Sequence, residues 1–412
     1  MLATFEGMEA KDFFTFALQL DERWEVTECV LDQDAGRLRL KLDFVVGSKF
    51  AAPGATHQLL CPVHDTVERK WRHLDFFQYQ TEVVARVPRV KTSEGNVVQI
   101  EVPWARPGSG FTLFMEAMIM LLAGKMPVLD VAELLREHDT RLWRVVIHYV
   151  NQAHEKRDWS KVKRILIDET SARRGHRYVT NVVDAANGEL LLMVPGKGAE
   201  AVEQFKEEMP RHGATPEQIE WICMDMSKAF RKGARESFPN AKVVFDRFHL
   251  MQMAGSAIDA IRRRLQAIGA NLKGGRWSLL GNEENRTQEQ KAERYRLCKL
   301  YPMLGRAIGL RDALQDILSL RDGSSLKWWC GWAFHSRLPE FKALAWTVKE
   351  HWDGILGFCE TGMTNAAIEA VNGVIQAAKR IARGFRNFEF FRAVAYLKSA
   401  NLEFSLPTLY PL

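Results

Sequence analysis

The chain has 412 residues, 47% hydrophobic and 26% charged, a composition that indicates an ordinary soluble globular protein with two to four domains. Its 57 Lys and Arg residues outnumber 51 Asp and Glu residues by only 6, so a surface for nucleic acid would have to come from local basic clusters. The N-terminal residues lack a signal-peptide pattern, the most apolar stretch (residues 111–126) is too short to span a bilayer, and six scattered cysteines indicate reduced thiols; together these predict a cytoplasmic protein without membrane contact.

Residues 1–105 are predicted to form a β-rich N-terminal domain. Two runs with strand-like alternation, residues 24–32 and 37–47, flank the turn-like sequence QDAG. A second hairpin is predicted from residues 81–90 and 96–104 around the turn TSEG. The sequence RPGSG then interrupts the pattern and ends this region.

The next predicted region, residues 106–158, is helical. Residues 126–150 contain two short amphipathic segments separated by REHD, which is helix-turn-helix spacing, although an ordinary helical hairpin gives the same pattern. In a DNA-binding motif of this kind the second helix enters the major groove. Arg141, Arg144 and His148 on that helix are therefore predicted DNA contacts, and a solvated helix face is the alternative.

Strand patterns return in residues 159–255, the predicted first part of a core. The order strand, strand, strand, helix, strand, helix, strand predicts a mixed sheet with flanking helices. Residues 256–358 show no strand-like alternation and are predicted to be an all-helical insertion, and residues 359–412 are predicted to complete the core. The predicted strands are residues 164–170, a hairpin in 177–196 that turns at Asn187 and Gly188, and residues 221–227 and 241–246.

Three of these strands are predicted to end in an aspartate: Asp168, Asp225 and Asp246. Glu169 follows the first of them. Solvation at a strand end explains one such residue, but buried charge is costly unless it is paired or binds a metal. Because sites gather where neighbouring strands of one sheet end, the repeated acids favour a shared site.

A later acid, Glu369, lies in the helical block of residues 364–397 and shares a helix face with Asn365 and Asn372. The ordinary interpretation of such a residue is a solvent-facing charge. Two aspartates on strands and a glutamate on a helix are also the carboxylate set that binds two Mg²⁺ ions in RNase H-like phosphoryl-transfer enzymes.

Several segments resemble the DDE transposases of the ISL-three family of bacterial insertion sequences, and together they cover nearly the whole chain. They are IDETSARRGHRYVT, CMDMSKAFRKG, FDRFHLMQ and NAAIEAVNGVIQAAKRIARGFRNFEFFRAVAYL, with CPVHDTVERKWRHLDFF, ARVPRVKT, VPWARPGSGFT and HDTRLWRVV upstream. The resemblance implies an α+β multidomain protein. Its RNase H-like mixed sheet would be interrupted by the helical insertion and preceded by the β-rich domain and the helix-turn-helix.

The same resemblance assigns the catalytic, metal-binding triad to Asp168, Asp225 and Glu369. It implies two Mg²⁺ ions, with Mn²⁺ as a possible substitute. Asp246 and His249 match a D-x-x-H signature near the active site, although a structural role for His249 is an equal alternative. The basic residues near these acids are predicted to contact DNA phosphates: Arg173, Arg174, Lys228, Lys379, Arg380 and Arg383.

Relatives carry a zinc module with paired Cys and His ligands, whereas here Cys61 and His64 form only a partial set, to which His57 and His73 could contribute. Bound zinc is therefore expected to be absent, because a tetrahedral structural site needs four ligands.

The function that these features predict is that of a transposase that binds the terminal inverted repeats in double-stranded DNA. It would pair them as a homodimer or higher oligomer near the bacterial nucleoid, and catalyse cleavage and strand transfer. A nuclease without strand transfer and a captured, non-catalytic DNA-binding regulator remain the alternatives.

Overall fold

The computed structural model forms two compact units. The N-terminal unit consists of Met1–Tyr149 with Glu403–Leu412, and the core unit consists of Val150–Leu402. The predicted domain boundaries are finer than this division and stay predictions. The residues that the structure describes are 9–53, 60–92, 94–173, 177–226, 228–281 and 285–409.

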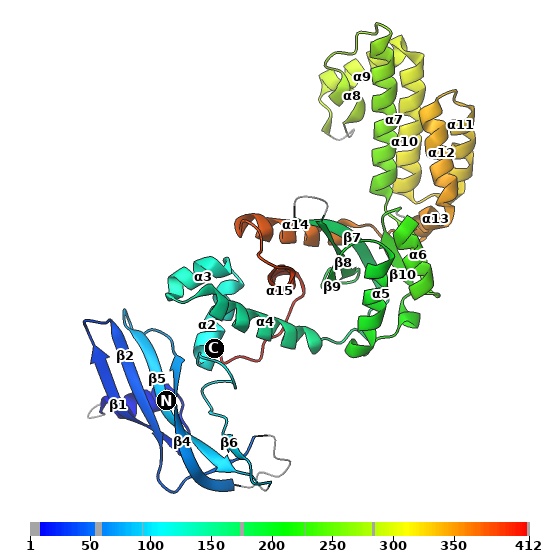
Figure 1. Cartoon of the computed structure of the whole chain (residues 1–412). Helices are drawn as coiled ribbons and strands as arrows, with labels where there is room; N and C mark the ends of the chain where they lie inside the picture. The colour runs from blue at the N-terminus through cyan, green and yellow to red at the C-terminus, as the bar shows by residue number, and fades with distance from the viewer. Residues whose placement is uncertain are drawn as a thin grey trace, which may run out of the picture. The chain divides into compact units, whose positions relative to one another are not determined.

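The N-terminal unit contains a six-stranded sheet with the order β1-β2-β5-β4-β3, and β6 pairs with β5 (Figure 1). Helix α1 (Ala10–Ala17) packs against β1. Tryptophan and phenylalanine side chains make edge-to-face contacts in its core, among them Trp24 with Trp104 and Trp71 with Trp104. The strands are β1 (Trp24–Asp32), β2 (Arg37–Phe44), β3 (Lys49–Ala51), β4 (Leu60–Arg72), β5 (Gln80–Lys91) and β6 (Val97–Gln99).

The first predicted hairpin is confirmed, because β1 pairs antiparallel with β2. The second is confirmed in part: β5 pairs antiparallel with β6, but β6 has only three residues. Strand β4 was missed. Its sequence, LCPVHDTVERKWR, contains a proline and many charges, and most of its side chains are exposed or half-buried, so it lacks an apolar alternation.

Three helices follow in this part of the chain, and they have the predicted helix-turn-helix spacing. They are α2 (Leu113–Ala123), α3 (Val128–Leu135) and α4 (Asp139–Glu155). Helix α2 begins at the cap Thr112, whose side chain accepts a hydrogen bond from the Met115 amide, and its buried residues include Glu116. Helix α3 ends at Arg136 in the left-handed conformation, which turns the chain into α4.

The core unit is built on a mixed five-stranded sheet with the order β11-β10-β7-β8-β9. The strands β7, β8 and β9 are antiparallel neighbours, and β10 and β11 are parallel to β7. The predicted turn at Asn187 and Gly188 lies between β8 and β9, where Gly188 has a φ of 74°. The strands are β7 (Arg164–Arg173), β8 (Arg177–Asp184), β9 (Leu190–Pro195), β10 (Trp221–Met224) and β11 (Lys242–Phe245).

Helices cover both faces of this sheet (Figure 1). Helices α5 (Ala199–Glu208) and α6 (Lys228–Ser237) pack on one face, where Ile165 and Ile167 of β7 join a core with Phe205 and Phe230. The other face is covered by α13 (Trp352–Thr361) on β11, by α14 (Ala366–Ile381) on β7 and β8, and by α15 (Phe388–Ser399) on β9.

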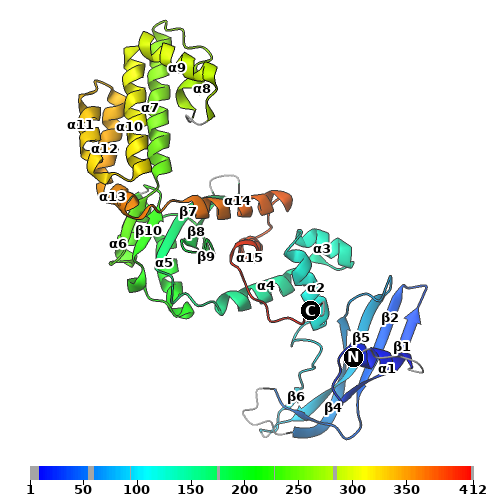
Figure 2. The ribbon, with the colours of Figure 1, turned by 180° about the vertical axis from the view of Figure 1, so that it is seen from behind.

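The predicted all-helical segment is confirmed, since no strand occurs in the described residues between β11 and α14. Its long helices α7 and α10 pack side by side, as both views show, and α12 packs on α7 (Figure 2). The helices are α7 (Arg247–Ala267), α8 (Arg276–Leu280), α9 (Gln288–Leu300), α10 (Pro302–Leu320), α11 (Leu326–His335) and α12 (Pro339–Glu350). No helix of the described ranges is long and apolar enough to cross a membrane.

Candidate functional site

Three aspartates occupy equivalent positions on three adjacent parallel strands. Ile167 of β7 pairs with Met224 of β10, and Met224 pairs with Phe245 of β11. The residues that follow these three are Asp168, Asp225 and Asp246. Neighbouring strands lie about 4.8 Å apart, so this register brings the three aspartates to one edge of the parallel part of the sheet.

The expectation that Asp168 and Glu169 end their strand is wrong, because β7 continues to Arg173. The antiparallel partner β8 runs past the point where β10 stops, and Asp168 pairs with Asn181 there. Side chains alternate along a strand, so Asp168 lies on the α14 face while Glu169 points to the opposite face.

The Asp168 carboxylate is half-buried and bonded by the amide of Asn372, which a second amide, that of Asn181, holds in turn. Asn372 of α14 donates a hydrogen bond of 2.8 Å from Nδ2 to Asp168 Oδ2, and Asn181 Nδ2 donates to Asn372 Oδ1 at 2.6 Å. Burial raises the pKa of Asp168 above its ordinary value, and the negative charges of Asp225 and Glu369 raise it further, while His249 acts in the opposite direction. Two of the acids assigned by the resemblance therefore act electrostatically on the third.

Helix α14 carries Glu369 in its first turn and is fastened to β7 by polar side chains. Gln376 Nε2 donates to Thr170 Oγ1 and to the Ser171 carbonyl, each at 2.8 Å, and Lys379 Nζ donates to the same carbonyl. Glu369 itself is exposed. Its spacing from these residues places it on the face that Asn372 and Gln376 turn toward the sheet.

His249 and Asp246 have different surroundings at this edge. His249 Nε2 lies 3.5 Å from Asp225 Oδ1, so this histidine is in contact with a predicted catalytic acid. Asp246 is 3% exposed and caps α7 through the Phe248 amide, at 3.0 Å, while its second oxygen accepts from the Asn365 amide at 3.1 Å. Its carboxylate is satisfied by backbone groups, which gives Asp246 a structural role beside the site.

The acids supply hard oxygen ligands, which is the donor chemistry that Mg²⁺ prefers. Burial and the negative charges of Asp225 and Glu369 disfavour the ionised form of Asp168, a cost that a bound cation would offset. Within the described ranges, no three His, Cys, Asp or Glu side chains are gathered closely enough to hold one ion. The match to a divalent metal is therefore one of donor chemistry, and the convergence of the three acids on shared ions stays a prediction.

The predicted phosphate contacts fall into two groups. Arg173 donates to the backbone carbonyls of Phe385 and Arg386, and Lys379 donates to Ser171, so both fasten parts of the chain to each other. Arg380 and Arg383 are exposed. Arg174 and the side chain of Lys228 lie outside the described residues.

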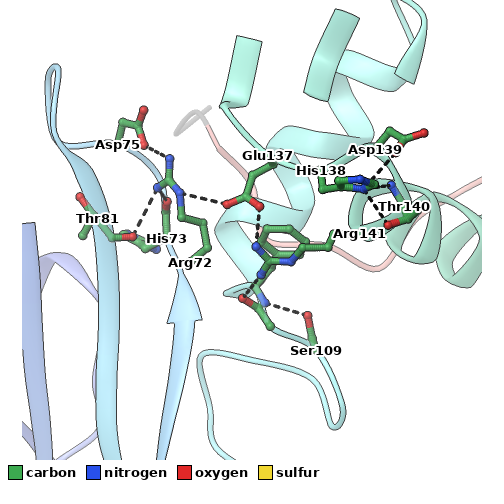
Figure 3. Close-up of polar contacts among 12 residues, drawn as sticks. Arg72, His73, Asp75, Thr81, Ser109, Glu137, His138, Asp139, Thr140 and Arg141 are labelled. Carbon is green, nitrogen blue, oxygen red and sulfur yellow. Dashed lines mark hydrogen bonds and ion pairs between the residues drawn. The ribbon is translucent and has the colours of Figure 1, made fainter. Parts of the chain in front are cut away.

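The predicted recognition residues on α4 also fall into two groups, those exposed to solvent and one that contacts the protein. Arg144 and His148 are exposed, whereas Leu142, Val145 and Val146 on the other side of the helix are buried. Arg141 instead pairs with Glu137 (Figure 3). It also donates to the Gly110 carbonyl at 3.1 Å, and its guanidinium lies 4.2 Å from the Phe111 ring centroid. Arg141 is thus occupied by contacts within the protein.

Sequence reasoning missed Asn372 as the partner of Asp168 and Asn181 as the partner of Asn372. The signal was present in part, because Asn372 lies three residues after Glu369 on the same helix face. Asn181 could not be identified without the register of β8 against β7, which places it opposite Asp168.

Comparison with known proteins connects these features. A family model described as "Transposase" matches residues 165–395, the model "Helix-turn-helix domain of transposase family ISL3" matches residues 100–150, and "zinc-finger of transposase IS204/IS1001/IS1096/IS1165" matches residues 59–94. The transposase for insertion sequence element IS1557 of Mycobacterium tuberculosis is 30% identical over 371 residues, which cover 82% of this chain and 83% of the relative. The transposase for insertion sequence element IS1001 of Bordetella parapertussis is 27% identical over 358 residues, with 80% and 84% covered.

The zinc-finger match contradicts the expectation that zinc is unlikely, since the N-terminal region is of a zinc-finger type. The ligand set of the described residues does not complete such a site, however. Cys61 and His64 lie on β4, and His73 shares a hydrogen bond of 2.8 Å between its Nδ1 and Thr112 Oγ1, with its pKa lowered to about 4 by burial. His57 lies outside the described residues.

Proposed function

The chain belongs to the ISL3 family of insertion-sequence transposases, DDE enzymes that transfer phosphoryl groups on DNA, and on that premise we propose that Asp168, Asp225 and Glu369 are its catalytic carboxylates. The observation that carries the proposal is the register of β7 and β10, which sets Asp168 beside Asp225, together with the hydrogen bonds that fasten the Glu369 helix over Asp168. The mixed sheet supports an RNase H-like core.

These three carboxylates would hold divalent metal ions, Mg²⁺ or Mn²⁺. When bound, two such ions activate the attacking oxygen and stabilise the leaving oxygen of a phosphoryl transfer. The residues of the chain contribute position: Asn372 fixes one oxygen of Asp168, His249 lies against Asp225, and Gln376 and Lys379 hold α14 on the sheet.

We further propose that α4 reads the ends of the element. Its exposed residues Arg144 and His148 would contact base edges in the major groove, and the exposed Arg380 and Arg383 on and after the Glu369 helix would contact phosphates near the acids. Cleavage and strand transfer then need two ends held together, which a homodimer or higher oligomer would do.

Glu369→Gln tests the triad, because it removes the charge that a metal needs while it keeps the size of the side chain. Glu389→Gln is a matched control, because Glu389 is also exposed and also lies in the first turn of a helix, α15. Both changes therefore remove a negative charge that interacts favourably with a helix N-terminus. Each variant is assayed for binding and Mg²⁺-dependent cleavage of an element-end duplex.

We expect the Glu369 variant to bind DNA about as well as the parent and to lose cleavage by a factor on the order of a thousand or more. The Glu389 variant should cleave normally. Near-parental cleavage by a folded Glu369→Gln protein would overturn the assignment.

A further inference from the structure

The turn of the helix-turn-helix is joined to the end of strand β4 by a chain of ion pairs made of Arg72, Glu137 and Arg141 (Figure 3). Glu137 lies between α3 and α4. Its Oε1 lies 3.4 Å from Arg72 Nε, and its Oε2 accepts from Arg141 Nη1. The side chains of Arg72 and Glu137 are 6% and 9% exposed, so this is a buried carboxylate between two guanidinium groups.

Backbone hydrogen bonds also join the end of β4 to the segment before α2. The Arg72 amide donates to the Gly110 carbonyl at 2.9 Å, and the Thr112 amide donates to the Arg72 carbonyl at 3.0 Å, which ties the start of α2 to β4. Arg141 closes the arrangement by donating to the same Gly110 carbonyl. A Cβ at Gly110 would lie 2.9 Å from Arg141 Nη2, so the glycine leaves room for this guanidinium.

A second contact fixes the residue before Glu137. Asp75 forms ion pairs with Arg72 and with Arg136, whose Nη2 lies 2.6 Å from Asp75 Oδ2. Arg136 has a φ of 55°, the left-handed conformation that ends α3. Two residues of the turn are therefore paired to Arg72 at the end of β4, Glu137 directly and Arg136 through Asp75.

These ion pairs and hydrogen bonds determine where α4 lies relative to β4. Arg141 lies one helical turn before Arg144, so a shift of Arg141 relative to β4 moves Arg144 by a similar amount. Removing the Glu137 charge would take the carboxylate partner from Arg141 and leave Arg72, whose side chain is 6% exposed, paired with Asp75 alone, which favours rearrangement at the turn.

We propose that Glu137, Arg72 and Arg141 are positioning residues that fix the recognition helix on the N-terminal sheet and thereby set the discrimination between an element end and other DNA. The inference rests on the proposed role of α4 in reading the element ends. It assigns Arg141, a predicted DNA contact, to the support of Arg144.

The test compares Glu137→Gln with Asp65→Asn in the full-length protein. Asp65 lies on the same strand as Arg72 and pairs with Arg89 away from the helices, so its variant loses the same charge from the same unit. The probes are a duplex with the terminal inverted repeat that flanks the gene and a scrambled duplex of equal length. Binding of both is measured at several salt concentrations.

Glu137→Gln is expected to reduce the ratio of specific to scrambled affinity by roughly tenfold or more, the loss typical of one misplaced base contact, while Asp65→Asn leaves the ratio unchanged. In an Arg144→Ala background, Glu137→Gln should cost little further discrimination, because both changes remove the same contact. Losses that add fully although Arg144→Ala by itself lowers discrimination, or losses that are equal on both duplexes, would overturn the proposal.

Arg141→Lys provides a second variant in case Glu137→Gln does not fold. It keeps the positive charge but not the forked contact to Glu137 and Gly110, and the same loss of discrimination is expected. Unchanged discrimination in a folded Arg141→Lys protein would also overturn the proposal. If Arg144→Ala alone leaves discrimination intact while Glu137→Gln lowers it, the positioning role stands and the assignment of Arg144 fails.

Discussion

Replacing Asn372 by alanine should weaken metal binding at the site without touching a carboxylate. The variant loses the hydrogen bond from Asn372 Nδ2 to Asp168 Oδ2, and it leaves Asn181 Nδ2 without its partner. A hydrogen bond to a charged group contributes about 1.5–3 kcal/mol. Residues that orient metal ligands typically change metal affinity by about 10- to 100-fold, which agrees with that energy.

The loss should also depend on pH. Because Asn372 donates to the ionised carboxylate, its removal raises the pKa of Asp168 beyond the elevation that burial already causes. Protons then compete better with the metal, so the difference from the parent should grow as the pH falls.

Two measurements check this prediction: the Mg²⁺ concentration for half-maximal cleavage and the Mg²⁺-induced rise in Tm, which needs no activity. Gln376→Ala is the matched control, because Gln376 also joins α14 to β7 but bonds only Thr170 and Ser171. We expect the Mg²⁺ requirement to rise about 10- to 100-fold for Asn372→Ala and much less for Gln376→Ala. Equal Mg²⁺ dependence in the two variants would refute the reasoning.

Three further outcomes are expected. Asp168→Asn should raise the Tm in EDTA at neutral pH, because a carboxylate whose folded pKa is raised costs stability once it ionises. The gain in Tm should vanish at a pH below the ordinary pKa of an aspartate. An unchanged Tm at neutral pH would contradict this prediction. Burial lowers the pKa of His73 and of His154 to about 4, so the folded protein should lose stability as the pH falls from about 6.5 to 4, where the unfolded chain binds protons that the folded one does not. Each histidine should give the unfolding free energy a slope of up to about 1.4 kcal/mol per pH unit in denaturant titrations. A flat profile over this range would argue against buried, neutral histidines. Trp329→Ala should lower the unfolding free energy by about 3–5 kcal/mol, because the Trp329 ring is fully buried and its Nε1 donates to the Leu310 carbonyl. Trp328→Ala, at a residue that is 62% exposed, should cost little.

Much of the core unit could be predicted from the sequence, because its strands are apolar runs bounded by turn residues. The hairpin at Asn187 and Gly188 needed no tertiary information, since the two residues are a known turn pair between alternating runs. The N-terminal sheet was harder. Strand β4 pairs with β5 along most of its length, but its polar sequence gives no alternation to detect.

The candidate acids could be picked out from the sequence, but their environment could not. Strand patterns located Asp168 and Asp225, and the resemblance located Glu369. The roles of the arginine side chains were not predictable, because a sequence does not show to which acceptor a guanidinium donates. Arg141 and Arg173 were expected to face DNA, yet both donate to carbonyls of the protein itself. Such contacts depend on segments that are distant in sequence and meet only in the fold.

A long helical segment separates Asp225 from Glu369, which raises the question of how the helix with the third candidate acid is placed on the sheet. One buried carboxylate answers it. Asp246 accepts from the Phe248 amide, where α7 begins, and from the Asn365 amide, directly before α14, so the entry and the exit of the insertion are held together at the end of β11. From that fixed start, Asn372, Gln376 and Lys379 follow Glu369 at intervals of three and four residues and bond β7 along one helix face. The position of Glu369 is therefore set by the sheet itself, and the insertion can vary in its helices without moving the acid.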